Sequence, residues 1–211
     1  MSPTLLKHKG RPVPYIAPWS AEYVPLPRLM AVAGMLHIKG QRRAAGTLWR
    51  PWLDKRGTGE PDYGDVHGPR QRECMLRMLC QVCGVPVARD QLGWPWLLEA
   101  HHGDGVWPER EVTTHPPTCE QCQPVAQVQC RPNRSRFASL RVGRVLADGV
   151  YGQLFRPSLP RPVPIGRKQT VYAGDPQLRW MLAGQMAATL LDVTVVDMHT
   201  QKPAALRAAA P

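Results

Sequence analysis

The sequence predicts an α+β fold, a small irregular domain organised around a four-cysteine cluster, with a β-hairpin and a C-terminal helix–strand unit. Three observations predict this class. The cysteines include two C-x2-C pairs, Cys80 with Cys83 and Cys119 with Cys122, which are separated by 35 residues. Proline accounts for 23 of the 211 residues, roughly twice its usual share. Hydrophobic residues make up 43% of the chain, enough for a packed core built from short elements and loops.

The chain is expected to divide into four segments. Composition changes from a proline-rich arm with short elements to the cysteine-bearing module, then to a basic hairpin with the C-terminal helix and strand, and last to a loose tail. These segments are residues 1–68, 69–131, 132–199 and 200–211.

The first segment is expected to be extended. Residues 1–30 carry three aromatic residues between prolines, so this arm is apolar enough to pack across the domain. Residues 29–38, LMAVAGMLHI, form either a buried strand or a short helix, because periodicity does not separate the two at this length. Residues 54–70 form a polar loop rich in glycine and aspartate.

The cysteine-bearing module is expected to contain two helices and a strand. The first helix is predicted from about Pro69 to Leu79, since its apolar residues recur at helical spacing and its arginines face elsewhere. Residues 94–100, WPWLLEA, are predicted to form a strand. The second helix is predicted over about 119–130, with Pro124 near its first turn, where a missing N–H costs least.

The third segment is expected to contain a hairpin, a helix and a closing strand. The hairpin is predicted over 137–155, because two β-rich runs flank Asp148-Gly149. The helix is predicted to start after Asp175, a typical N-cap residue that is followed by proline. Residues 191–198, LDVTVVDM, are predicted to form the closing strand.

The two cysteine pairs predict one structural zinc site, with Cys80, Cys83, Cys119 and Cys122 as ligands. Zn²⁺ takes four ligands in a tetrahedron, with thiolate sulfurs at about 2.3 Å. Each C-x2-C turn directs two thiolates to one point, so two turns close the shell and leave no open position. Gly84 suits the sharp chain reversal of a knuckle, and the second pair opens a predicted helix whose N–H groups can donate to thiolates. A knuckle followed by a helix-borne pair is the arrangement of a treble clef.

Two other uses of these cysteines are less consistent with the sequence. The N-terminus lacks a signal-like apolar segment, and no apolar run reaches the roughly 18 residues of a membrane span. We therefore expect a cytoplasmic protein without structural disulfides and without membrane contact. A redox C-x-x-C motif would explain one pair and not both. The remaining two cysteines, Cys74 and Cys130, are expected to be buried free thiols rather than a fifth ligand or a redox pair.

Positive charge lies on either side of the cysteine-bearing segment. The formal net charge is +11, whereas residues 74–130 carry three Lys or Arg and six Asp or Glu. Residues 131–168 carry nine Lys or Arg and one acidic residue. This distribution is expected of a protein that binds a polyanion such as the backbone of DNA or RNA. The alternative is a generally basic composition without such a partner.

Five arginines follow the second cysteine pair and are the candidate nucleic-acid contacts: Arg131, Arg134, Arg136, Arg141 and Arg144. Each arginine can neutralise a phosphate and add to a salt-dependent affinity. No base-reading helix accompanies them, so sequence-specific readout is not expected. Alternatively, some of them offset the negative zinc–thiolate centre or cover the edge of the predicted hairpin.

His101 and His102 are the candidates for catalysis. They lie 18 and 17 residues before Cys119, and with the four cysteines they resemble the treble-clef HNH nucleases, in which a histidine at this position activates water beside a divalent metal. The chain departs from that family at residues 113–118, TTHPPT, which lack its asparagine, and at Gln123-Pro124, which replaces its histidine. These departures imply too few ligands for a catalytic metal. The alternative to a catalytic role is that His101 and His102 are exposed residues of a polar turn.

A second resemblance covers more of the chain. The strings VHGPRQRECMLRMLCQVCG, PPTCEQC and GDPQLRWMLAGQM are similar to those in a group of actinomycete four-cysteine zinc-knuckle proteins. The similarity spans about residues 60–198 and implies a single domain built around the zinc knuckle. It implies no activity.

The sequence therefore predicts a zinc-stabilised intracellular binding protein, associated with nucleic acid or part of a nucleoprotein complex. One alternative is a scaffold or assembly protein with purely structural zinc, whose proline-rich arms lie on a protein partner. The other is a degenerate HNH-type metal-dependent nuclease. A role without catalysis is favoured, because the predicted zinc shell is closed.

Overall fold

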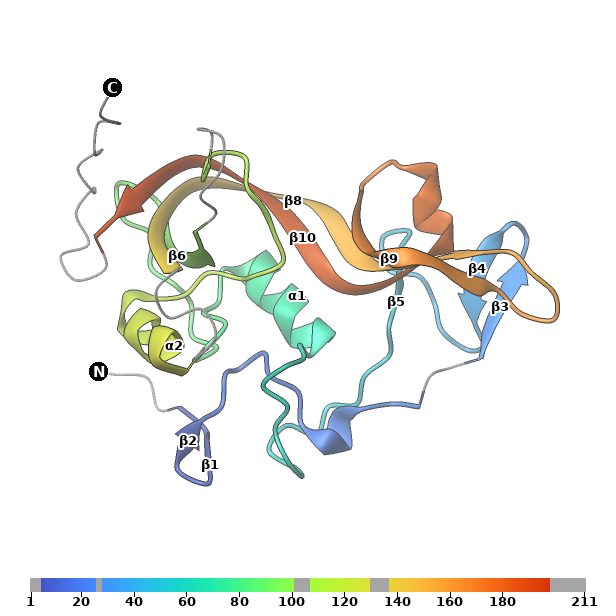
Figure 1. The fold of residues 1–211 in the computed structure, drawn as a ribbon, viewed down its shortest axis with the longest axis horizontal. Coiled ribbons are helices and arrows are strands. Elements are labelled where there is room, and N and C mark those ends of the chain that lie inside the picture. The colour runs from blue at the N-terminus through green and yellow to red at the C-terminus, as the bar shows by residue number, and fades with distance from the viewer. Residues whose placement is uncertain (1–4, 26–27, 101–106, 130–136, 198–211) are drawn as a thin grey trace.

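The computed structural model describes residues 5–25, 28–100, 107–129 and 137–197. Within these residues the fold is mixed α and β, mostly strands with two α-helices. Two antiparallel strands, β8 (Phe137–Arg156) and β10 (Met181–Val196), run side by side along most of the length of the molecule (Figure 1). They connect an end that contains α2 with an end that contains β3 and β4.

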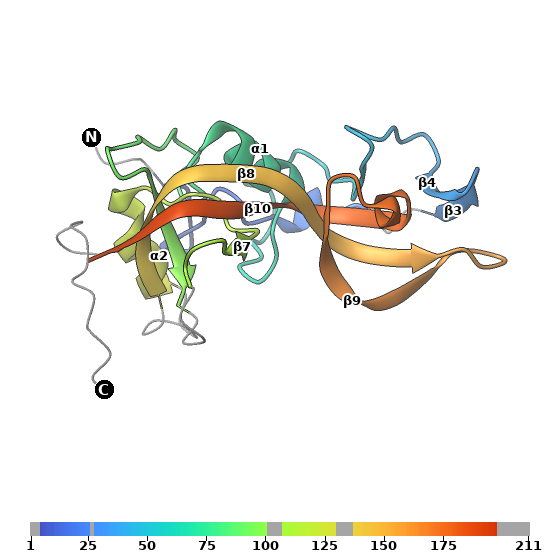
Figure 2. The ribbon, with the colours of Figure 1, turned by 90° about the horizontal axis from the view of Figure 1, so that it is seen from above.

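The two long strands form the centre of a six-stranded sheet. The main path of this sheet is β5-β10-β8-β6; β7 pairs with β10, and β9 pairs with β8. All pairs are antiparallel except β5 with β10, which is parallel. In Figure 2 the ribbon of β8 and β10 curves, and β9 leaves its plane at one end. The shorter strands are β5 (Leu48–Trp49), β6 (Trp94–Glu99), β7 (Val112–Thr113) and β9 (Val163–Tyr172).

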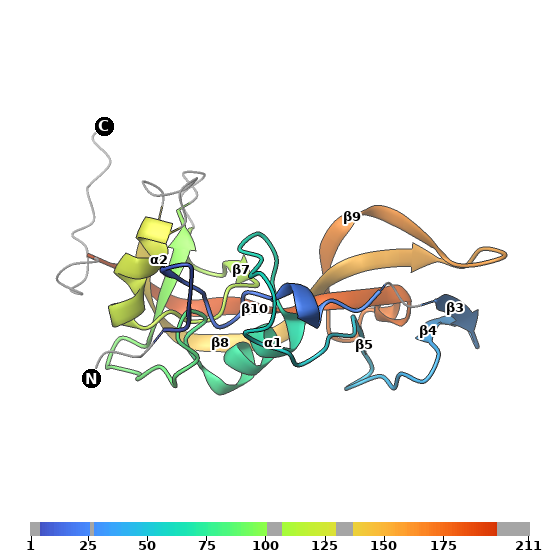
Figure 3. The same ribbon diagram turned by 90° about the horizontal axis from the view of Figure 1, so that it is seen from below.

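Helix α1 (Gly68–Arg77) packs against β10, and Met75 lies in the core that the helix shares with β6, β8 and β10. Figure 3 shows the N-terminal segment passing beside α1. The remaining elements are short: β1 (Lys7–His8), β2 (Arg11–Pro12), η1 (Ser20–Glu22), β3 (Leu29–Val32), β4 (Met35–Ile38), η2 (Glu120–Cys122), α2 (Gln123–Gln129) and η4 (Pro176–Trp180).

Several predicted elements are confirmed. The first helix and the strand predicted over 94–100 are present as α1 and β6, and the second helix is present as η2 and α2, with Pro124 in the first turn of α2. Residues 29–38 form two strands, where one strand or helix was expected. They are joined at Ala33 and Gly34, whose φ values of 48° and 74° suit the two-residue turns that connect antiparallel strands.

The hairpin predicted over 137–155 is wrong, because these residues belong to the single strand β8. Asp148-Gly149 does not turn the chain. The Asp148 carboxylate accepts a hydrogen bond from the Thr189 hydroxyl at 3.1 Å. The backbone carbonyl of Asp148 accepts one from the Ala173 amide at 2.7 Å. Both bonds join Asp148 to residues far along the chain, next to a register shift in β10. Pairing with β9 and β10 thus outweighs the local turn preference.

The C-terminal helix is also shorter than predicted. Asp175 does cap a helical turn, since its carboxylate accepts from the Gln177 amide at 2.7 Å. That turn is the 3-10 helix η4, which ends at Trp180, and β10 begins at Met181. The apolar residues from 181 to 190 belong to a strand at the centre of the sheet, which is buried on both faces and therefore shows no alternating pattern. The predicted strand at 191–198 is the second half of β10 as far as Val196.

Candidate metal centre

The first cysteine pair lies in a tight reversal directly after α1, which ends at Arg77. The Gly84 amide donates to the Cys80 carbonyl at 2.7 Å, and the Cys80 amide donates to the Val85 carbonyl at 2.8 Å. Gly84 has a φ of +75°, and a Cβ added there would lie 2.8 Å from the Tyr15 ring. Glycine is therefore required at this position both by the turn and by the close approach of the N-terminal arm.

The second pair lies where the chain enters η2 and α2. Cys119 is the N-cap of η2, and its amide donates to the Cys80 sulfur at 3.4 Å. The two cysteine loops are also joined through Gln81, whose amide donates to the Pro117 carbonyl at 3.0 Å and whose side chain donates to the Thr118 hydroxyl at 2.8 Å. These bonds hold the loops in contact although they lie far apart in the sequence.

The four predicted ligands, Cys80, Cys83, Cys119 and Cys122, converge on one point. Their sulfurs all lie within 4.8 Å of one another, and the Cys83 and Cys119 sulfurs are 3.9 Å apart. Sulfurs about 2.3 Å from a tetrahedral zinc ion are about 3.8 Å apart, whereas a disulfide needs about 2.05 Å. Cys80 and Cys122 are buried. Within the described residues this is the one group of three or more His, Cys, Asp or Glu side chains that could hold a metal ion.

The thiols of the cluster influence one another's protonation. Hydrogen bonds from Cys122 and Cys80 lower the pKa of the Cys119 thiol, and the same contact with Cys119 raises the pKa of Cys122. Burial raises the pKa of Cys83. A metal ion binds thiolates and must displace the thiol protons, so that affinity for a metal is expected to fall in acid.

Gln123, the first residue of α2, anchors the centre to the sheet, a role that was not predicted from the sequence. It is fully buried. Its side-chain amide donates to the carbonyls of Trp96 and Thr118, both at 3.3 Å, and its oxygen accepts from the Ser139 hydroxyl at 2.7 Å. Sequence alone gives no signal for this role, because the partners lie on three different segments.

Arg141 forms a second anchor. Its side chain is 1% exposed, and it donates from Nε to Asp90 at 2.6 Å and from Nη2 to Glu120. Asp90 follows the first cysteine pair, and Glu120 lies inside the second. Arg141 thus links both cysteine loops to β8 and offers no exposed phosphate contact. This agrees in part with the alternative that some arginines offset charge near the metal centre.

The other predicted site residues are placed differently. Arg144 is exposed and pairs with Asp192 at 2.7 Å. Cys74 is buried, and burial raises the pKa of its thiol to about 12, consistent with a free core cysteine. The remaining predictions concern residues that lie outside the described parts of the chain: His101, His102, Cys130, Arg131, Arg134 and Arg136.

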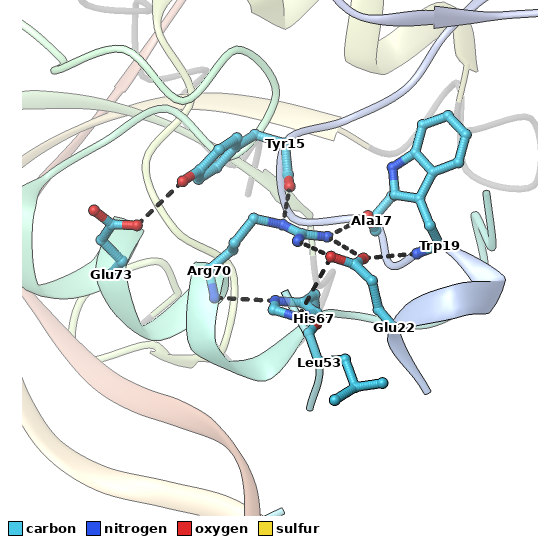
Figure 4. Close-up of polar contacts among 8 residues, drawn as sticks. All are labelled: Tyr15, Ala17, Trp19, Glu22, Leu53, His67, Arg70 and Glu73. Atoms are coloured by element: carbon cyan, nitrogen blue, oxygen red, sulfur yellow. Dashed lines mark hydrogen bonds and ion pairs between the residues drawn. The ribbon is translucent and has the colours of Figure 1, made fainter. Parts of the chain in front are cut away.

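A buried ion pair between Glu22 and Arg70 holds the N-terminal arm on α1 (Figure 4). The two residues are joined by hydrogen bonds of 2.5 and 2.8 Å. Arg70 also donates to the carbonyls of Tyr15 and Ala17, and Glu22 accepts from the Trp19 amide. Burial opposes the charge of Glu22, but the bonds from Arg70 and Trp19 hold its pKa below the ordinary value. Arg70 was predicted to face away from the core, and that prediction is wrong.

His67 completes this cluster as the N-cap of α1. Its Nδ1 accepts from the Arg70 amide at 3.4 Å, and its Nε2 lies 3.1 Å from the Leu53 carbonyl, to which it donates in the neutral form. Burial and the nearby Arg70 charge lower the pKa of His67. Both ring nitrogens are therefore used within the fold, and His67 is a structural residue.

The arm also contacts the first cysteine loop directly. The Tyr15 and Ile16 amides donate to the carbonyls of Val82 and Gln81, at 2.9 and 3.2 Å. Val13, Ile16, Ala17 and Trp19 are buried. The arm thus packs across the domain, as its composition suggested, and these residues are covered by the protein's own chain.

Comparisons with known proteins add no assignment. No family model matches the chain, and neither a curated protein nor a solved structure matches it significantly. No helix among the described residues is long and apolar enough to cross a membrane. The interpretation of the centre therefore rests on its own geometry.

Proposed function

We propose that this protein is a zinc-stabilised binding protein associated with nucleic acid, in which the metal has a structural role. The observation that carries the proposal is the convergence of four cysteine sulfurs within 4.8 Å. Four thiolates fill a tetrahedral shell, so no position remains for water or substrate, and a closed shell of this kind is typical of structural zinc. Zinc would supply a rigid cross-link between two loops 35 residues apart.

We interpret the metal centre as a treble-clef-type knuckle. A tight reversal carries the first pair, and the second pair lies at the start of the helical segment η2–α2. Sulfur-only tetrahedral sites hold zinc or iron. Zinc is proposed because it binds such a shell without redox chemistry, and metal analysis distinguishes the two ions.

The net charge supports a nucleic-acid partner. The chain carries a formal charge of +11, while residues 74–130, which hold the metal ligands, carry −3 before any thiolate is counted. Four thiolates and one Zn²⁺ would make this segment more negative still. The positive charge is therefore concentrated away from the metal ligands, where it can meet a polyanion.

One purification tests the proposal. The protein is purified without added metal, its zinc and iron are measured by plasma mass spectrometry, and co-purifying nucleic acid is measured by absorbance. Binding of labelled oligonucleotides is then titrated between about 50 and 200 mM salt. We expect one zinc per chain and an affinity that falls steeply with salt.

Other outcomes would contradict the proposal in distinct ways. A folded protein without metal would disprove the zinc site. A stable protein complex without nucleic-acid binding at low salt would favour the scaffold alternative. Plasmid cleavage with Mg²⁺ or Mn²⁺, lost in His101→Ala or His102→Ala, would instead establish the nuclease alternative.

A further inference from the structure

One end of the molecule carries almost no negative charge. Residues 28–53 and 149–187 bring together β3, β4, β5, β9, η4 and the adjoining parts of β8 and β10, which we call the basic end (Figure 1). These two ranges contain ten Lys or Arg and a single acidic residue, Asp175. Asp175 caps η4. The helix α2, which follows the last metal ligand directly, lies at the opposite end of the molecule.

A groove opens beside the basic end. Its volume is about 1090 Å³, and it lies between the segment around Arg50, strand β8 and the loop before β9. Four cations line it: Arg28, Arg50, Arg161 and Lys168. The one carboxylate in the lining is Asp65, which lies 3.8 Å from Arg50.

Three of these cations are available to a ligand. Arg28, Arg161 and Lys168 are exposed, and within the described parts of the chain none of them forms an ion pair. The opposite end, which contains the cysteine cluster and α2, is called the metal end. There Arg141 and Arg144 are both paired with carboxylates. Unpaired cations gathered on the walls of one groove raise the local concentration of anions.

Aromatic side chains share the groove with these cations. Trp52, Tyr151 and Phe155 contribute to its lining. The Arg50 guanidinium lies 4.7 Å from the centroid of the Trp52 ring. The centroids of the Tyr23 and Trp52 rings are 5.1 Å apart. Surfaces that bind single-stranded nucleic acid typically combine cations that contact the phosphate backbone with aromatic rings that stack on the bases.

We propose that this groove binds single-stranded nucleic acid, with Arg28, Arg161 and Lys168 on the phosphates and the aromatic lining against the bases. The inference rests on the proposed function and names its surface and substrate class. A duplex fits less well, because its bases are stacked on one another and do not offer their faces to the aromatic lining. An acidic peptide would match the charge but would leave the aromatic rings without bases to stack on.

The test uses fluorescence anisotropy of a labelled oligothymidylate of about 15 nucleotides, with the matching oligouridylate to compare DNA and RNA. The variant Arg28→Ala/Arg161→Ala/Lys168→Ala removes the exposed groove cations. It should weaken binding at least about tenfold at low salt and reduce the slope of log affinity against log salt by about 2, since each phosphate contact on a single strand adds about 0.7.

A matched control removes the same charge elsewhere. The variant Lys7→Ala/Arg77→Ala/Arg110→Ala changes three exposed cations outside the basic end and should stay within about threefold of the wild type. Equal zinc content and melting temperature in both variants show that neither has lost its fold. An abasic oligomer of the same length should bind at least about tenfold more weakly than oligothymidylate, because it offers nothing to stack on.

The outcomes separate this inference from the function on which it rests. Suppose that the wild type binds oligonucleotides but both triple variants weaken binding equally, or the groove variant leaves binding unchanged. The assignment of the binding site to the groove is then wrong, and the proposed function stands. If a duplex or an oligoglutamate peptide binds more tightly than the single strand, the substrate class is wrong. If the wild type binds no nucleic acid at low salt, the proposed function fails as well.

Discussion

The metal end and the basic end of this protein use charge in opposite ways. At the metal end cations are paired inside the structure, as in the buried Arg141, which joins Asp90 and Glu120. At the basic end Arg28, Arg161 and Lys168 remain exposed. The comparison indicates that Arg141 contributes to folding at the metal end, whereas the three groove cations at the basic end form no ion pair within the described residues.

The two ends also differ in what holds them together. The cysteine loops are short and contain little regular structure, so their order depends on cross-links: the proposed metal, Gln123 and the Arg141 pairs. The basic end is held by the ladders of β8 with β9 and β10, which resume after each of their register shifts. Loss of metal should therefore affect one end far more than the other.

The largest expected effect follows from Cys80→Ser. We expect loss of bound zinc and a decrease of more than about 5 kcal/mol in the free energy of unfolding, because structural zinc binds with about 10–16 kcal/mol in small domains. Zinc analysis and urea denaturation measure the two quantities. Cys74→Ala is the control: it should retain zinc and cost about 1 kcal/mol.

Hydrogen exchange on the same variant tests the contrast between the ends. Amides of residues 79–87 and 117–129 should lose protection, while those of β3 and β4 should keep it. Equal loss at both ends would show that the molecule unfolds as one unit without zinc, and the comparison would fail.

The second effect is expected from Glu22→Gln. The change leaves the Arg70 guanidinium buried without its counter-charge, so the free energy of unfolding should fall by about 3 kcal/mol. Urea denaturation at neutral pH provides the measurement. Glu60→Gln, which removes an exposed partner of Lys9, is the control and should leave the midpoint unchanged. Similar losses in the two variants would argue against a special role for the buried pair.

A pair of glycine substitutions compares local strain at the two ends. Gly84→Ala combines an unfavourable φ with a clash against Tyr15 and should cost about 3 kcal/mol. Gly34→Ala has a similar φ but no atom within 4 Å of the new Cβ, so it should cost about 1 kcal/mol. Thermal melting of both variants ranks them. The reverse order would mean that the arm does not press on the cysteine loop in solution.

The smallest expected effect is a pH dependence from His67. Its pKa is lowered in the folded protein, so the unfolded chain takes up a proton first as the pH falls below about 6.5. The contribution of His67 to the free energy of unfolding is therefore fully present above that pH. It should fall by about 1 kcal/mol between pH 7 and 5.5. His67→Asn, which keeps an N-cap side chain, should flatten the curve over this window. An unchanged curve would place the titration elsewhere.

The convergence of the four cysteines was predictable because its signal is local. Two residues between the cysteines of each pair constrain where the sulfurs point, whatever the rest of the chain does. The long strands were not predictable in the same way. Asp148-Gly149 and Asp175-Pro176 are strong local signals for a turn and a helix, yet both regions are shaped by β10, which pairs with distant residues.

The buried arginines show the same limit. Arg70 and its partner Glu22 lie 48 residues apart, and Arg141 lies 51 residues from Asp90. A sequence shows that such residues are charged but does not show which carboxylate meets them. For this reason the basic segment after the second cysteine pair suggested phosphate contacts, although Arg141 is used inside the protein.

The position of β10 has a consequence for how the chain reaches its native state. This strand lies between β5 and β8, yet it is made after both of them. While the chain emerges from a ribosome, the backbone edges of β5 and β8 that pair with β10 remain unpaired until β10 is made. The sheet is thus completed late in synthesis. A nascent chain halted before residue 181 should be prone to aggregation and depend on a chaperone.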